Sequence, residues 1–116
     1  MLTIYSLLNK KNIRKNKGAK KMIISQLSIA PLGKNISVSK YVKIVIKTLE
    51  KNKIKHQTNA MATVIETKNL DELFKAVKQA HNTVIKAGAK RVITELKIDH
   101  RIDKKATIET KLKSIQ

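Results

Sequence analysis

The sequence of 116 residues has room for one domain with a modest core, and it contains no cysteine. A chain without cysteine lacks disulfides, thiolate metal sites and cysteine nucleophiles, and its composition fits a cytoplasmic protein. The formal net charge is +18, which attracts polyanions at long range. Sequence-specific readers of nucleic acids, however, depend on arginines and stacking aromatic residues. Both are scarce, since 23 of the 26 basic residues are lysine and 3% of all residues are aromatic.

Residues 1–21 combine a short apolar run with seven basic residues and no acidic residue. A secretory signal carries its charges before the apolar stretch, and a membrane-spanning helix needs about 20 apolar residues, so the segment is neither. We interpret it as a flexible basic arm, or else as residues that precede a natural start at Met22, where the first strand pattern begins. Residues 22–116 then form a single domain with a net charge of +11.

The first predicted element is a strand over residues 22–30, MIISQLSIA. Its alternation of period two sets Ile23, Leu27 and Ile29 on one face, and the polar Gln26 and Ser28 on the other. The proline and glycine that follow end the strand and begin a loop.

Residues 39–51 are predicted to form an amphipathic helix. Ser37 or Ser39 is suited to accept hydrogen bonds from the unpaired backbone donors of its first turn. One side of this helix carries lysines, and the opposite side carries apolar residues at helical spacing: Val38, Val42, Val45 and Leu49.

Two further strands are predicted over residues 54–59 and 61–67, the second of which contains a β-branched run. Asn59 and Ala60 lie near their junction, and asparagine tolerates turn conformations that branched residues resist. We therefore predict that the segment NAMA, which begins at Asn59, contains a tight or bulged turn.

A second helix follows Asn69, which forms an imperfect capping box with Glu72, and it ends at Gly88. A last strand spans residues 91–99, and Thr107 is suited to start a short terminal helix. One side of that helix holds three apolar residues: Ile108, Leu112 and Ile115. The order β-α-β-β-α-β with a terminal helix predicts the ferredoxin-like α+β fold, an antiparallel sheet with two helices covering one face.

The uncovered face of such a sheet would hold Gln26 and Ser28 beside the strand at 61–67. Several other positions on this face are apolar or small: Ile24, Ala30, and Val64 or Ile65 according to register. A half-apolar face needs cover, and a second copy of the chain is the simplest source of it. We therefore expect a homo-oligomer.

Four segments carry a resemblance to a known family: SIAPLG, SVSKYV, NAMATVIET and LDELFKAVKQAHNTVIKAGAKRVITELKIDHRID. Over residues 22–113 the chain resembles the small MTH-type thiamine-binding proteins of archaea and bacteria, which are related to the YkoF-like hydroxymethylpyrimidine/thiamine-binding proteins. The resemblance implies a ferredoxin-like fold, a dimer or tetramer built through sheets, and a small pocket for the pyrimidine half of thiamine.

Members of that family often have TPMGT where this chain has NAMAT, at residues 59–63. Alanine in place of glycine at position 62 adds a methyl group where a ligand or another backbone approaches. Small residues around Met61 would still leave space for a flat ring, with the thioether packed against it.

A pyrimidine with an exocyclic amine needs hydrogen-bond acceptors, one or two donors and an apolar wall. The resemblance points to eight ligand-binding residues, of which the methionine and the tyrosine would supply the wall: Gln26, Ser28, Ser37, Tyr41, Asn59, Met61, Thr63 and Glu66. For Ser28, Thr63 and Glu66, the alternative is an ordinary place on the sheet surface or at a strand end.

The positive field of the chain should repel the thiamine cation unless Glu66, Glu95 or Asp99 lies near it. A phosphorylated ligand would instead be attracted by Lys97 or Arg101. We therefore expect free hydroxymethylpyrimidine, or a phosphate ester, to bind at least as well as thiamine.

The sequence shows no phosphate-binding glycine-rich loop, no nucleophile elbow and no closely spaced histidine pair, so it predicts no enzyme, metal site or cofactor. His81 is expected at the edge of the core, bonded to the backbone or to a carboxylate. The alternative functions are a nucleic-acid-binding module on the same plan, or an oligomeric scaffold without a small ligand. RNA-recognition domains stack bases on strand aromatics that residues 22–30 and 61–67 lack, so nucleic acid is expected to be a weak partner, and a membrane none.

Overall fold

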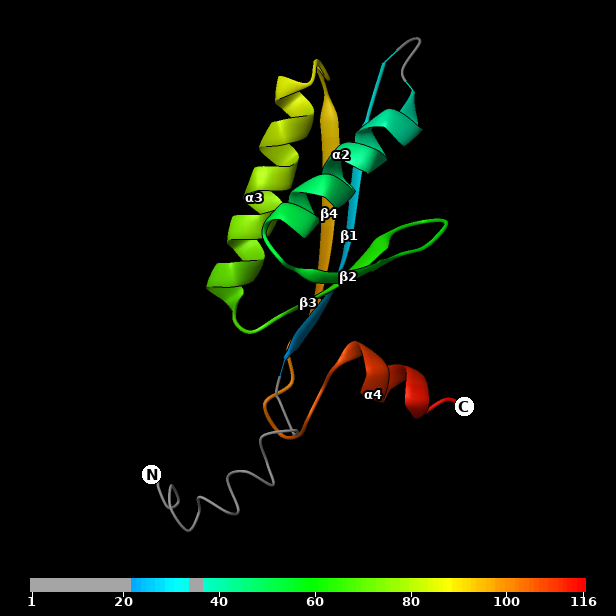
Figure 1. Cartoon of the computed structure of the whole chain (residues 1–116), viewed down its shortest axis with the longest axis vertical. Helices are drawn as coiled ribbons and strands as arrows, with labels where there is room; N and C mark the ends of the chain where they lie inside the picture. The colour runs from blue at the N-terminus through cyan, green and yellow to red at the C-terminus, as the bar shows by residue number, and fades with distance from the viewer. Residues whose placement is uncertain (1–21, 34–36) are drawn as a thin grey trace.

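The computed structural model describes residues 22–33 and 37–116, and its elements follow the predicted order (Figure 1). The predicted arm at residues 1–21 lies outside the described residues. The elements are β1 (Ile23–Pro31), α2 (Val38–Lys51), β2 (Lys55–Thr58), β3 (Thr63–Thr67), α3 (Leu70–Lys86), β4 (Val92–Asp99) and α4 (Ile108–Lys113).

The four strands form one antiparallel sheet in the order β2-β3-β1-β4. The helices α2 and α3 pack side by side on one face of this sheet (Figure 1). This strand order and helix layer confirm the predicted ferredoxin-like α+β fold. None of the described helices has the length and apolar character that spanning a lipid bilayer demands.

The core lies between the sheet and the two helices. Ile23, Leu27 and Ile29, which were predicted to share a face of β1, are all buried in it together with Ile65 of β3. The helices contribute seven buried side chains: Tyr41, Val45, Leu49, Leu73, Ala76, Ala80 and Val84. Because the odd-numbered residues of β1 face this core, its even-numbered residues line the opposite, open face of the sheet.

The two long helices begin differently. The N-cap residue of α2 is Ser37, but its side chain makes no capping hydrogen bond and its Oγ lies 3.2 Å from Oγ of Ser39, so the cap predicted there is wrong for Ser37. At α3 the predicted cap is confirmed, because the Asn69 side chain accepts from the backbone N–H of Glu72 at 2.8 Å. The Glu72 carboxylate accepts from the N–H of Lys68 at 2.8 Å, one residue before the cap, which makes the box imperfect.

The end of α2 is a Schellman motif. The N–H of Lys53 donates to the carbonyl of Glu50 at 3.0 Å, and that of Ile54 donates to Leu49 at 2.9 Å. This geometry gives Lys53 a φ of 56°, in the left-handed region. At the corresponding place after α3 the chain has Gly88, whose φ is 116°, as expected for a glycine that ends a helix.

Replacing Lys53 by glycine should raise the free energy of unfolding by about 0.5–1 kcal/mol. The left-handed conformation costs a lysine about 1–2 kcal/mol and a glycine almost nothing, and the greater entropy of the unfolded glycine chain offsets part of this gain. The Lys53 side chain is exposed, so no packing is lost. Urea unfolding measures the change. Lys51→Gly, inside the last turn of α2, is the control and should lose about 1 kcal/mol, and a loss of stability in Lys53→Gly as well would contradict the prediction.

The segment predicted to turn does connect β2 and β3. The N–H of Asn59 donates to the carbonyl of Ala62 at 2.9 Å, and the two residues between them form the tip of the hairpin. Both strands are shorter than predicted, because all four residues from 59 to 62 belong to the connection between them. The special tolerance of asparagine is not used, since Lys53 is the one described non-glycine residue with a positive φ.

Candidate functional site

The open face of the sheet carries side chains in rows that cross the four strands. The registers place one residue of each strand in a first row, which we call the charged row: Lys55, Glu66, Ile24 and Asp99. They place four more in the adjacent row, which we call the amide row: Gln57, Val64, Gln26 and Lys97. These two rows form the floor of any site on this part of the face.

The short helix α4 docks on the charged row through a buried hydrogen bond. The backbone N–H of Ile108 donates to Oε1 of Glu66 at 2.8 Å, and Glu66 is only 9% exposed. Thr107 and Thr110 close a capping box at the same end, where the sequence predicts that the helix starts. The Glu66 carboxylate therefore satisfies a backbone donor at the positive end of α4.

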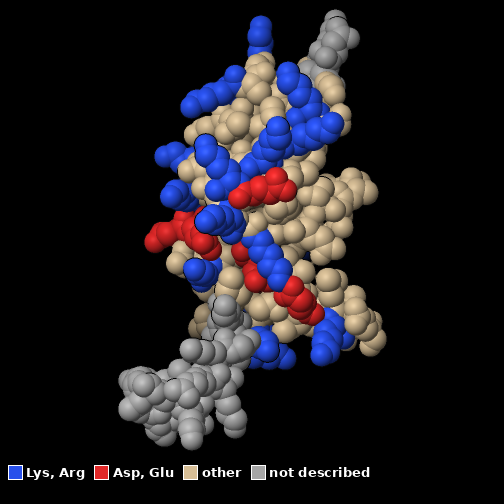
Figure 2. Space-filling model, viewed as in Figure 1, with Lys and Arg blue, Asp and Glu red and all other residues tan. Residues whose placement is uncertain are grey.

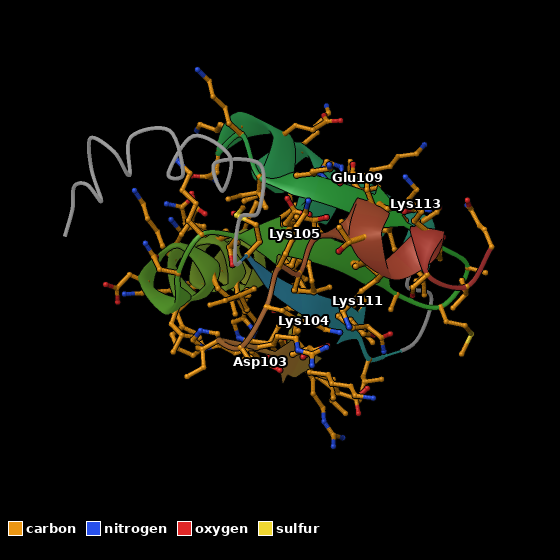
Figure 3. All side chains as sticks on the ribbon, turned by 90° about the horizontal axis from the view of Figure 1, so that it is seen from below. Asp103, Lys104, Lys105, Glu109, Lys111 and Lys113 are labelled. Carbon is orange, nitrogen blue, oxygen red and sulfur yellow. The ribbon has the colours of Figure 1, made fainter. Side chains whose placement is uncertain are left out.

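Two ion pairs at the surface flank this bond, and their members on α4, Glu109 and Lys111, are labelled in Figure 3. Lys55 pairs with Glu109, and Nζ of Lys111 lies 2.5 Å from Oδ2 of Asp99. The ammonium of Lys111 is the main reason that the pKa of Asp99 lies below its ordinary value, and Lys55 lowers the pKa of Glu109 in the same way. Both carboxylates are therefore ionised at neutral pH, and these exposed pairs orient α4 more than they stabilise it.

The helix also covers the apolar end of the open face. Ile24 is only 7% exposed, and it lines the same cavity as Ile108 and Leu112 of α4. We expected a second copy of the chain to cover this end, but the terminal helix of the same chain does so. This end of the open face therefore gives no reason for an oligomer to form.

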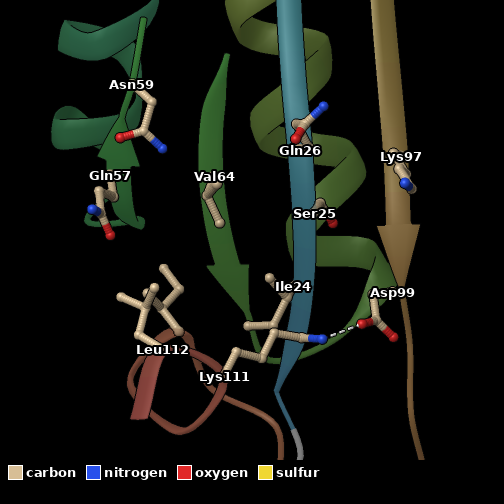
Figure 4. Close-up of a pocket in the computed structure, with 11 residues that line it drawn as sticks. Ile24, Ser25, Gln26, Gln57, Asn59, Val64, Lys97, Asp99, Lys111 and Leu112 are labelled. Carbon is tan, nitrogen blue, oxygen red and sulfur yellow. Dashed lines mark ion pairs between the residues drawn. The ribbon is translucent and has the colours of Figure 1, made fainter. Parts of the chain in front are cut away.

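A cavity of about 300 Å³ lies on the amide row beside α4 (Figure 4). All four residues of the amide row line it, one from each strand. Lys111 and Leu112 of α4 lie at one end, and Asn59 lies on the side of the hairpin (Figure 4). Asp99 joins the lining next to Lys111, with which it is paired.

The cavity combines an apolar surface with a few polar groups. Its apolar surface includes three side chains: Ile24, Val64 and Leu112. Its amides, each with a donor and an acceptor, belong to Gln26, Gln57 and Asn59. All three amides are on exposed residues, and none is hydrogen-bonded to another side chain or to the backbone within the described part of the chain. With Lys97 and Lys111 at the rim, this arrangement suits a flat polar ring that carries an anionic group.

A second cavity, of about 260 Å³, lies between the β2–β3 hairpin, β1 and α2. Four of the predicted ligand-binding residues line it: Ser28, Asn59, Met61 and Thr63. Its other walls are mainly aliphatic, and Oγ1 of Thr63 lies 3.2 Å from Oγ1 of Thr58. Because Met61 is 89% exposed, its thioether covers little of this space.

The structure does not bring the eight predicted residues into one site. Gln26 and Asn59 line the first cavity, and Asn59 also lines the second. Tyr41 is 7% exposed within the core, and Glu66 is bound to α4. Ser37 lies in a separate groove on the outer side of α2.

Sequence reasoning missed Gln57 and Leu112 as lining residues. Gln57 shares the face of Gln26, but strand alternation in β2 is too weak to show this before its pairing is known. Leu112 was placed on the apolar side of the terminal helix, but its position on the sheet depends on the path of residues 100–106 and has no local signal.

Other polar residues have local roles. Nδ1 of His81 lies 2.7 Å from Oγ1 of Thr94, so the backbone or carboxylate partner expected for His81 is wrong. Arg101 donates to Asp103 from two nitrogens, at 2.6 and 2.9 Å, and this lowers the pKa of Asp103 to about 2. Arg101 does not line the first cavity. Within residues 22–33 and 37–116, no cluster of histidine and acidic side chains is placed to hold a metal ion.

Comparison with known proteins identifies the family. Residues 25–116 match the model of the family described as thiamine-binding protein. The UPF0045 protein MJ1052 of Methanocaldococcus jannaschii is 53% identical over 93 residues, covering 80% of this chain and 91% of that protein. The UPF0045 protein YqgV of Bacillus subtilis is 40% identical over 99 residues, covering 81% and 94%. The crystal structure of MJ1052, 52% identical in sequence, gives a TM-score of 0.75 over 82% of this chain and 96% of that chain.

The matched region includes all of the sheet from Ser25 onward, both covering helices and α4. It therefore contains every residue of the amide row and the helix that borders the first cavity. The description of the family names the binding of a ligand and no reaction. The chain belongs to the thiamine-binding protein family.

Proposed function

We propose that this chain binds the aminopyrimidine half of thiamine, as free hydroxymethylpyrimidine or as a phosphate ester, in the cavity between the amide row and α4, and that it catalyses no reaction. The observation that carries the proposal is the convergence of three exposed amides and two lysines on one apolar surface in a chain of this family. An aminopyrimidine needs acceptors for its amine, donors for its ring nitrogens and an apolar wall, and the cavity offers all three.

The size of the cavity favours one ring over two. Its volume of about 300 Å³ is at the lower end of the range of about 300–1,000 Å³ for small-molecule pockets. A pyrimidine with small substituents would fill much of this space, whereas the second ring of thiamine would extend into solvent.

The charges around the cavity favour an anionic or neutral ligand. Asp99 is paired with Lys111, whereas Lys97 forms no ion pair within the described residues. Within one chain, one positive charge without an ion-pair partner therefore faces the cavity. Residues 22–116 carry a net charge of +11, so the surroundings of the cavity stay positive even when a second copy brings a glutamate near Lys97. A phosphate would be attracted by Lys97, and the thiamine cation would be repelled.

Calorimetric titration of the full chain with hydroxymethylpyrimidine, hydroxymethylpyrimidine phosphate and thiamine tests this function. We expect saturable binding in the micromolar range or tighter, with the free pyrimidine or its phosphate bound at least as tightly as thiamine. Gln26→Leu should weaken this binding roughly 2- to 12-fold, because one hydrogen bond contributes about 0.5–1.5 kcal/mol. Thr63→Val, which removes a hydroxyl from the second cavity, is the control and should leave the affinity unchanged.

Each part of the proposal has its own contrary outcome. Absence of heat with all three ligands would overturn the function. Loss of binding in Thr63→Val with full binding in Gln26→Leu would place the ligand in the second cavity. Tighter binding of thiamine than of both pyrimidines would refute the argument from charge.

We also propose that two copies of the chain pair through β4. This strand of eight residues lies at an edge of the sheet, so one side of its backbone has no strand partner among the described residues. Ile93 and Ile98 on it are 45% and 38% exposed. An open edge with exposed apolar residues is suited to pair with a second edge, and a two-fold axis lets the same strand serve both copies.

The charges of β4 favour one register for this pairing. With Leu96 on the two-fold axis, Glu95 of each copy lies opposite Lys97 of the partner subunit. A shift by two residues in one direction would set Glu95 opposite itself, and a shift in the other direction would do the same to Lys97. A shift by one residue would put the helix-covered face of one sheet on the same side as the open face of the other.

A further inference from the structure

The outer surface of α2 and α3 is strongly basic (Figure 2). Exposed lysines recur along α2 at intervals of three or four residues: Lys40, Lys43, Lys47 and Lys51. Residues at this spacing lie on one side of a helix, with a rise of about 6 Å for every four residues. None of the ion pairs found within the described residues involves these lysines. They form a stripe of positive charge without ion-pair partners among the described residues.

Two grooves follow this stripe, and we call them together the lysine grooves. The groove between α2 and α3 is lined by three lysines and by no acidic residue: Lys47, Lys51 and Lys86. The groove on the outer side of α2 is lined by Lys40, Lys43 and Lys47, with Glu50 as the acidic lining residue. Because Lys47 lines both, the two grooves adjoin and form one basic concave surface.

The floor of the groove between the helices is polar and fixed. Nδ2 of Asn52 donates to Oε1 of Gln79 at 2.7 Å, which links α2 to α3 across it. The hydroxyls of Thr48 and Thr83 donate to carbonyls of their own helices, at 2.9 and 2.7 Å. Asn82 is exposed and adds an amide to the lining. The groove therefore exists before any partner binds.

We propose that the lysine grooves bind the phosphate backbone of single-stranded nucleic acid without reading its sequence. Lysine ammonium groups act as point charges toward phosphates, and their repeat along α2 is comparable to the interval between successive phosphates of an extended strand. No aromatic residue and no arginine lines either groove, so bases are neither stacked nor read. The lysine grooves lie on the helix layer, and the cavity proposed for the pyrimidine lies on the opposite, open face of the sheet. Binding of nucleic acid would therefore be a second function beside the binding of a pyrimidine.

The shape and composition of the grooves favour nucleic acid over an acidic lipid surface. Proteins that bind membrane surfaces insert apolar side chains between the lipids. None of the large hydrophobic side chains that are exposed within the described residues lines either groove. The groove between the helices, with its polar floor, is suited to an extended strand, whereas a flat bilayer would touch only its rims.

Two variants of the full chain that lose the same charge test the proposal. The groove variant is Lys43→Gln/Lys47→Gln/Lys51→Gln/Lys86→Gln. The control variant, Lys68→Gln/Lys90→Gln/Lys105→Gln/Lys113→Gln, removes four exposed lysines that line neither groove. Fluorescence anisotropy with a labelled oligouridine, at several salt concentrations, gives the affinity and its salt dependence, and thermal melts check that both variants fold.

The groove variant should bind more weakly and with a shallower dependence on salt. Each phosphate contact to a single strand contributes about 0.7 to the slope of log K against log salt, so four lost contacts reduce the slope by about 3. Between about 50 and 200 mM salt, the native chain should therefore lose roughly 50-fold more affinity than the groove variant. The control variant should keep most of the native slope. Equal slopes in the two variants would overturn the proposal. It would also be overturned if the native chain bound phosphatidylserine vesicles more tightly than oligouridine and only the groove variant lost this vesicle binding.

Discussion

Replacing Glu66 by alanine should release α4 from the sheet, at a cost of about 1–3 kcal/mol in the free energy that holds this helix. The Glu66 carboxylate accepts the N–H of Ile108 at 2.8 Å in a buried position, and alanine would leave that donor without a partner. Hydrogen exchange of the amides at residues 106–113 measures the effect. Their exchange should accelerate roughly 5- to 150-fold, while exchange in α3 changes much less.

Two further variants separate the buried bond from the charges around it. Glu66→Gln keeps an oxygen that accepts the N–H of Ile108, so it should accelerate exchange much less than alanine does. Lys111→Gln removes only an exposed ion pair and should have little effect. If Glu66→Ala and Lys111→Gln accelerated exchange equally, the buried hydrogen bond would not be what holds α4.

The same variants connect α4 to the proposed ligand site. Glu66 does not line the first cavity, but the helix that it holds supplies Ile108, Lys111 and Leu112 to the lining. Glu66 is therefore a positioning residue for the site. Glu66→Ala should weaken pyrimidine binding in proportion to the release of α4, and Glu66→Gln should largely preserve it.

The helix layer and the order of strands are predictable from sequence because their signals are local. The apolar spacing in α3, its cap at Asn69 and the glycine at position 88 each act within one or two turns, and the structure confirms them. Local residue preferences predict less well where several residue types can occupy the same turn or helix-end position. The end of α2 takes a left-handed lysine at position 53, and the hairpin turns at Asn59 without any positive φ.

The sequence alone could also have excluded one combination of the predicted ligand-binding residues. Thr63 and Glu66 are three residues apart on one strand, so alternation puts them on opposite faces, and no single site on the open face could use both side chains. No local sequence pattern indicates where α4 docks on the sheet. It depends on a hydrogen bond between Glu66 and Ile108, 42 residues apart in sequence, which forms only after the whole sheet has assembled.

Reversing the charge of Glu95 should dissociate the dimer that we propose through β4. In the register centred on Leu96, Glu95→Lys would set a lysine opposite Lys97 of the partner subunit at both symmetric positions. Two attractive cross-strand pairs would become repulsive, a change of about 1–4 kcal/mol that weakens the dimer roughly 5- to 1000-fold. Sedimentation velocity over a series of concentrations measures the shift from dimer to monomer.

The double variant Glu95→Lys/Lys97→Glu decides whether register or total charge is responsible. It restores opposite charges in the same register and has the net charge of the native chain, so it should dimerise again. Glu50→Lys is the matched control, since it changes the net charge as much as Glu95→Lys does but lies on the outer side of α2. A native chain that is monomeric, a double variant as dissociated as the single one, or a Glu50→Lys variant that also dissociates would each contradict pairing through β4. Dissociation of the single variant together with restoration in the double variant would require that residues 95 and 97 face each other across a two-fold axis, because in the registers shifted by two residues Glu95 and Lys97 do not lie opposite each other.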